Sequence, residues 1–143
     1  MEHPDKRITD FISKHHVLTL ATQRNNKVWC ANCFYAYRKE DQALIFTSDI
    51  ETKHIKDIIV NKSVAASIVL ETKVIGKIQG IQIEGIVEMA TKEEDSVFKK
   101  HYLKRFPFAI LNDSPIWVLY IHYIKFTDNR LGFGKKIIWE KNK

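Results

Sequence analysis

The segment from Val74 to Met89 constrains the fold of this chain more than any other part of the sequence. Its apolar residues and glycines fall on two faces of an extended chain, with Val74, Gly76 and Ile78 on one and Ile81, Ile83, Gly85, Val87 and Met89 on the other. A change of phase within a strand is typical of a β-bulge, and Gly80 stands where the phase changes. The segment therefore predicts a long, bent strand of the kind that curves a sheet into a barrel and lets a ligand approach the backbone.

The rest of the chain alternates short β-prone segments with turns and a few helices. Apolar strand patterns occupy residues 17–22, 28–37, 43–47, 64–70 and 116–126. The polar runs at 24–27 and 38–42 predict hairpin turns. Helical spacing covers residues 8–15 and 52–61, and the capping box Thr91–Glu94 begins a third helix that Pro107 ends. Gly132 and Gly134 lack the spacing of a nucleotide-binding loop and predict a glycine-bent final hairpin. These elements predict an α+β protein built on an antiparallel barrel.

Composition narrows the class of protein. With 143 residues, 45% of them hydrophobic, the chain is expected to form one domain over residues 1–143. No apolar run has the length of a membrane span, and the N-terminus lacks a signal-peptide core, so we expect a cytoplasmic protein. The formal charge of +6 is spread over the sequence, although four lysines form a basic tail. A solvated surface or a seat for a small anion is favoured over nucleic-acid binding, which stays an alternative through that tail.

The two cysteines, Cys30 and Cys33, form a C-x-x-C pattern. That spacing occurs in redox motifs and in half zinc sites. Here it lies within a predicted strand, where residues three apart point to opposite faces. The pattern favours two unpaired thiols and no metal site.

Residues 43–61 read as a strand, a short polar loop and a helix that opens with Thr52 and Lys53. The first N–H groups of a helix lack intrahelical partners and attract anions. A hydroxyl and an ammonium at that position predict a phosphate seat, and an ordinary capped surface helix is the alternative.

This order of elements, with Phe46-Thr47-Ser48 followed by Thr52-Lys53, resembles the pyridoxamine-phosphate-oxidase-like FMN-binding split-barrel superfamily. Thr52 stands where that family often has Arg, which removes one charge from the phosphate seat. A closer resemblance, to the bacterial YhbP-like branch, rests on residues 29–32, 34–35, 105–107, 124–129, 131–136 and Trp139. The resemblance implies a six- to seven-stranded antiparallel Greek-key split β-barrel with about three short helices.

The resemblance also implies a homodimer with FMN at the subunit interface. The phosphate would lie near Thr52 and Lys53. The residues implied around the flavin ring are Cys30, Ala31, Asn32, Phe46 and Thr47, with Gly80 and Gln82 contributed by the long strand. The positions that hold a pyridoxal-type substrate in the oxidases find no match, which disfavours vitamin-B6 oxidation.

Three functions follow as hypotheses. The first is an FMN-dependent oxidoreductase acting on an unidentified small molecule. The second is a non-catalytic module that binds FMN, haem or another cofactor, since fold alone does not decide chemistry. The third is nucleic-acid binding through the basic tail. His54 and Tyr35 lie near the expected site along the chain, but a helix-surface histidine and a core tyrosine are the favoured interpretations.

Overall fold

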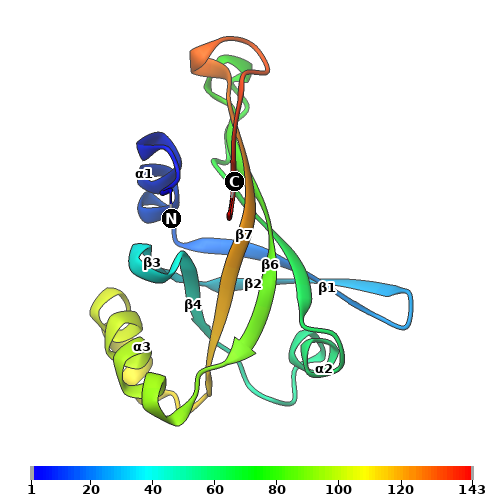
Figure 1. The fold of residues 1–143 in the computed structure, drawn as a ribbon, viewed down its shortest axis with the longest axis vertical. Helices are drawn as coiled ribbons and strands as arrows, with labels where there is room; N and C mark the ends of the chain where they lie inside the picture. The colour runs from blue at the N-terminus through cyan, green and yellow to red at the C-terminus, as the bar shows by residue number, and fades with distance from the viewer. Residues whose placement is uncertain (1, 143) are drawn as a thin grey trace.

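The computed structural model describes residues 2–142, whose arrangement is shown in Figure 1. Within that range the helices are α1 (Lys6–Lys14), α2 (Lys53–Val60) and α3 (Lys92–Arg105). The strands are β1 (Val17–Arg24), β2 (Lys27–Phe34), β3 (Ala36–Arg38), β4 (Ala43–Thr47), β5 (Ser63–Val69), β6 (Gln79–Met89), β7 (Ile116–Asp128) and β8 (Lys136–Glu140). Short 3-10 segments are η1 (Lys39–Asp41), η2 (Ile75–Lys77), η3 (Pro107–Leu111) and η4 (Asn129–Leu131).

All strands join one antiparallel sheet in the order β2-β1-β5-β6-β7-β4-β3, with β8 added to β7. The long strands β6 and β7 follow the long axis of the molecule, and β1 and β2 lie across them (Figure 1). The sheet therefore curls into a half-barrel, which confirms the expected split-barrel fold with three helices. The described residues form eight strands, because the predicted strand at 28–37 is divided at Tyr35 and the final hairpin adds β8.

The main core fills the inside of the curled sheet. Its largest fully buried side chains include Tyr35, Phe46 and Phe126. A second, smaller core lies under α3, where Phe98 and Tyr102 pack with residues of β3, β4 and β7. Strand β4 lies between the two cores, which explains why four of its five residues are apolar and buried on both faces.

The expected bulge exists, but it lies elsewhere than predicted. Residues Val74–Ile78 are not part of the strand: they form a loop with one 3-10 turn, and β6 keeps a single phase from Gln79 onward. The register shifts between Glu84 and Gly85, where His122 of β7 is the extra residue. The inward side chains of β7 change parity there, from Ile121 to Ile124.

The two strand glycines of β6 have different environments. A Cβ on Gly85 would lie 2.2 Å from the Tyr120 carbonyl oxygen, so the close approach of β7 requires glycine at that position. A Cβ on Gly80 would meet only ordinary contacts at 3.7 Å. The sequence pattern indicates a bulge at Gly80 only because residues 74–78 have the alternation of a strand.

Other local patterns in the sequence predict the structure that is observed. Asn25 and Asn26 both have positive φ and close the β1–β2 hairpin, as expected for a two-residue hairpin turn. The Thr91–Glu94 capping box is formed at the start of α3. Tyr35 is fully buried and donates its hydroxyl hydrogen to the Ile12 carbonyl, which confirms its structural interpretation. No helix among residues 2–142 is long and apolar enough to cross a membrane.

Candidate functional site

The β1–β2 hairpin carries side chains to both faces of an edge strand. In β2 the odd-numbered residues point toward the barrel interior, where Cys33 is buried, and the even-numbered ones point outward, where Cys30 is exposed. The two thiols therefore lie on opposite faces, as the strand parity predicted. Strand β2 ends the sheet and pairs only with β1, so one of its edges is free of strand pairing.

The inner face of this hairpin meets α2 at a basic pocket of about 470 Å³. Throughout, "the basic pocket" denotes the space lined by Arg24, Asn25, Lys27, Glu51, Lys53, Lys56 and Asp57. It holds four cationic side chains and two carboxylates, a surplus of two positive charges. Such a surplus suits a small dianion.

Asp57 anchors α2 to the sheet within this pocket. Its buried carboxylate accepts hydrogen bonds from Thr22 Oγ1 at 2.9 Å and from Lys53 Nζ at 2.9 Å. Burial raises the pKa of Asp57, but the bonds from Lys53 and Thr22 outweigh that effect and hold the pKa below its ordinary value. The Lys53 ammonium also lies 5.3 Å from the ring centre of Trp29, which joins α2 to β2.

Helix α2 begins where the sequence predicts, with Thr52 at the N-cap and Lys53 as its first residue. The Thr52 hydroxyl makes no capping bond and instead donates to the Asp49 carbonyl oxygen. The first N–H groups of this helix are thus not satisfied by the Thr52 side chain. This leaves the helix start as a potential anion contact.

A short polar chain connects the end of β4 to α2. Ser48 Oγ lies 2.7 Å from His54 Nε2, and the Ser48 side chain offsets part of the rise that burial causes in the pKa of Cys33. Desolvation lowers the pKa of His54, and burial raises the pKa of Cys33. His54 is therefore half-buried and bonded, rather than the surface residue expected. No local pattern indicates this pairing, because Ser48 and His54 meet only through the fold of the loop between β4 and α2.

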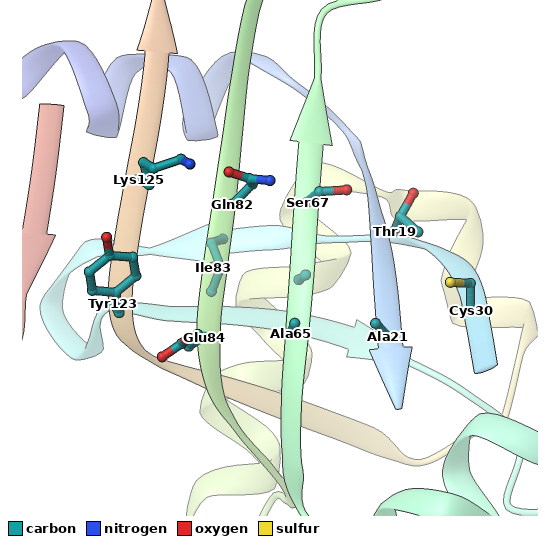
Figure 2. Close-up of a pocket in the computed structure, with 11 residues that line it drawn as sticks. Thr19, Ala21, Cys30, Ala65, Ser67, Gln82, Ile83, Glu84, Tyr123 and Lys125 are labelled. Carbon is teal, nitrogen blue, oxygen red and sulfur yellow. The ribbon is translucent and has the colours of Figure 1, made fainter. Parts of the chain in front are cut away.

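The outer face carries a second pocket, of about 460 Å³ (Figure 2). Two rows of cross-strand neighbours line it. One row is Lys125, Gln82, Ser67 and Thr19, and the other is Tyr123, Glu84, Ala65, Ala21 and Cys30. Thr19 donates to Asn32 Oδ1 at 2.9 Å and so extends the first row to β2. The alanines, on β5 and β1, leave a floor between the polar side chains of β6 and β7 and Cys30 of β2.

The structure divides the predicted site residues between these two faces. Cys30, Asn32 and Gln82 belong to the outer face, and Gly80 lines a neighbouring pocket there. On the other side, Ala31 and Thr47 are half-buried, Thr52 and Lys53 begin α2, and Phe46 is wholly buried in the core. Gln82 is three strand spacings from Asn32, or roughly 14 Å.

One ligand in one protomer therefore cannot contact all nine residues. The sequence patterns do not single out Arg24, Lys27 or Asp57, which fall in a predicted turn and a predicted helix. No local pattern links these three residues, because only the docking of α2 on the hairpin brings them together. No group of three or more metal-ligating side chains is present in the part of the chain described.

Comparison with known proteins identifies relatives. No protein-family model matches the chain. It is 42% identical over 131 residues to a UPF0306 protein of Photorhabdus laumondii, covering 92% of each chain. It is 34% identical over 143 residues to a UPF0306 protein of Yersinia pseudotuberculosis, covering 99% of this chain and 97% of the relative.

Solved structures share the fold at low sequence identity. A heme binding protein from Mycobacterium smegmatis matches with a TM-score of 0.81 at 15% identity, over 98% of this chain and 60% of that one. A FAD-binding protein from Mesorhizobium loti matches with a TM-score of 0.70 at 14% identity, over 82% and 89%. A NimC/NimA family protein from Clostridium acetobutylicum matches with a TM-score of 0.68 at 20% identity, over 94% and 90%. The chain thus belongs to the UPF0306 family and has a split-barrel fold.

Proposed function

We propose that this chain is an FMN-binding flavoprotein that acts as a homodimeric oxidoreductase on a small molecule, within the YhbP-like branch of its superfamily. The basic pocket carries the proposal. Its surplus of two positive charges matches the charge of a phosphate monoester near neutral pH, which is about −1.5 to −2. The pocket also adjoins the free edge of β2, along which a planar ring system could extend.

The flavin ring would lie along the inner side of β2. Trp29 and Ala31 follow Lys27 on that side of the strand, and Trp29 is 47% exposed. An edge strand offers unpaired backbone N–H and C=O groups, which can bond the polar edge of a flavin. The flavin would supply the redox chemistry, and the chain would orient the ring and hold its phosphate.

A second copy would cover the outer face. Antiparallel sheets tolerate one solvated face, but this one exposes apolar side chains among its polar rows. Val28, Val69 and Ile138 are 79%, 66% and 58% exposed, and all three belong to that face by register. A dimer through this face would bring one protomer's Gln82 and Cys30 pocket against its partner.

The proposal is tested by the ligand that the protein carries and by its preference for phosphate. Protein purified under native conditions should be yellow, and mass spectrometry of the released ligand should identify FMN. In fluorescence titrations FMN should bind more tightly than riboflavin, which lacks the phosphate. We expect Lys53→Ala to weaken FMN by about ten-fold or more and to leave riboflavin nearly unchanged. Equal binding of FMN and riboflavin by the wild type would contradict a phosphate-anchored flavin.

One observation favours haem as a second candidate. The bulge residue His122 is exposed and lines a further outer-face pocket of about 520 Å³ that includes Ala21 and Ala65. Histidine is a common axial ligand of haem iron, and a matched structure is named a heme binding protein. The Soret band of added haemin should then sharpen and shift on binding, and His122→Ala should reduce that change. Flavin absorbance together with an unchanged free-haemin spectrum would leave FMN as the cofactor.

A further inference from the structure

The tip of the β1–β2 hairpin places two positive charges side by side. Arg24 and Lys27 are direct cross-strand partners next to the Asn25-Asn26 turn, and both line the basic pocket. Like charges directly opposite each other in a β-hairpin are destabilising. Within residues 2–142 neither side chain makes a hydrogen bond or ion pair with a carboxylate, although the charge of Arg24 is among those that lower the pKa of Asp57. The two charges repel each other at the exposed tip of the hairpin, and an anion bound between them would remove that repulsion.

The two lysines of α2 in the same pocket are, by contrast, already paired. Lys53 Nζ lies 2.9 Å from Asp57 Oδ2, and Lys56 Nζ lies 3.3 Å from Glu51 Oε2. Both carboxylates of the pocket thus form ion pairs with lysines of α2. The surplus of two charges resides on the hairpin.

We propose that the phosphate in the basic pocket is held chiefly by Arg24 and Lys27 of the hairpin, with Lys53 in a supporting position fixed by Asp57. The identity of the ligand as FMN rests on the proposed function above. Arg24 brings a planar guanidinium that can donate two parallel hydrogen bonds to phosphate oxygens, and Lys27 brings a point charge. Binding would also remove the repulsion between the two side chains.

This arrangement predicts opposite effects on stability and on binding. Arg24→Gln or Lys27→Gln removes one of two repelling charges, so the thermal midpoint of the ligand-free protein should stay the same or rise. The same substitutions should weaken FMN by about ten-fold each, because each removes one charge-assisted contact to phosphate. Riboflavin affinity should not change. A residue with only a structural role in the turn would not show this combination.

The experiment compares wild type with Arg24→Gln, Lys27→Gln and Lys62→Gln. FMN and riboflavin are titrated by flavin fluorescence, and thermal midpoints are measured with and without pyrophosphate. Lys62→Gln is the matched control, since it removes an exposed lysine that pairs with Glu88 outside the basic pocket and should leave FMN affinity unchanged. Unchanged FMN affinity in both hairpin variants would overturn the inference while leaving the proposed function intact.

The pyrophosphate measurement tests the anion site independently of flavin binding. If wild type binds neither FMN nor riboflavin, the proposed flavin function fails. Stabilisation by pyrophosphate that is lost in Arg24→Gln and Lys27→Gln would then still support the hairpin anion site. Absence of any pyrophosphate effect in that case would overturn the site as well.

Discussion

Asp57 shows how one residue determines the geometry of the candidate site. Its carboxylate is buried between α2 and the sheet. It accepts hydrogen bonds from Thr22 of β1 and from Lys53, the first residue of the helix. Lys53 thereby has a fixed position above Trp29, although its side chain is about half exposed. The site's supporting lysine is held in place by a buried acid that the sequence pattern did not reveal.

Replacing Asp57 with Asn should destabilise the protein. The change removes a charge-assisted acceptor from Lys53 and weakens the bond from Thr22, which we expect to lower the free energy of unfolding by about 1.5–3 kcal/mol at pH 7. Urea denaturation measures this directly. Asp10→Asn is the control, because Asp10 pairs with Lys6 at the exposed surface and should have little effect. Equal stability of the two variants would contradict the anchoring role of Asp57.

The pH dependence of the same variant has a defined sign. In the folded chain the pKa of Asp57 lies below its ordinary value of 3.8. The contribution of Asp57 to the free energy of unfolding is therefore complete above pH 3.8, and it is lost as the pH falls through the lower pKa of the folded state. The stability difference between wild type and Asp57→Asn should therefore shrink in acid. Burial alone would raise the pKa and give the opposite trend.

At the scale of elements, the bulge between β6 and β7 shapes the half-barrel. His122 is inserted without a register partner, and Gly85 lies opposite, close to the Tyr120 carbonyl. The inward face of β7 changes parity there, so one strand serves two parts of the core. Ala21, Ala65 and Glu84 line both of the outer-face pockets next to this point.

Gly85→Ala should be strongly destabilising and Gly80→Ala should be tolerated. A methyl group at position 85 would lie 2.2 Å from a backbone oxygen, which cannot move without breaking the β6–β7 pairing. Overpacking of this kind costs about 1–3 kcal/mol or more. At position 80 the nearest atoms are 3.7 Å away. The thermal unfolding midpoints of both variants test this prediction. A Gly80→Ala protein with a midpoint as low as that of Gly85→Ala would contradict the assignment of the bulge to Gly85.

A second inter-element contact positions the helices. Arg105, the last residue of α3, donates to the carbonyl oxygens of Tyr35, Ser13 and His15. Two of these acceptors lie at the C-terminal end of α1, where backbone carbonyls lack intrahelical donors. One guanidinium thus joins α3, α1 and the bend between β2 and β3.

At the scale of the whole molecule, the outer face is the surface that we propose for assembly. The main core fills the inside of the curled sheet and α3 covers β3, β4 and β7 on the opposite face, while the rest of the outer face presents pockets and exposed apolar side chains. The proposed dimer would bury this face.

Ala65→Arg is therefore expected to dissociate the dimer. Ala65 is exposed on the floor of the outer pocket, so a long charged side chain can be accommodated by a monomer but would be buried in the interface. Light scattering at micromolar concentration should give twice the chain mass for wild type and a single chain mass for the variant. Glu93→Arg, on the exposed surface of α3, is the control that should stay dimeric. A monomeric wild type would contradict both the dimer and a cofactor site built between subunits.

The sequence by itself determined the features that depend on neighbours along the chain. Strand parity separated Cys30 from Cys33, the Asn25-Asn26 pair set the hairpin turn, and α2 begins at Lys53 as its pattern indicated. Backbone sterics, side-chain alternation and unpaired helix-end N–H groups are local properties, so the sequence specifies them directly.

Only the tertiary structure decided how these elements combine. Residues 74–78 look like strand but form a loop, and the phase change belongs to β7, because pairing register depends on the partner strand as well as on local pattern. The docking of α2 through Asp57 unites Lys53 with Arg24 and Lys27 in one pocket. The tertiary structure also buries Phe46 in the core, away from Cys30 and Asn32 on the outer face. Such contacts join residues far apart in sequence, and no local signal encodes the distance between them.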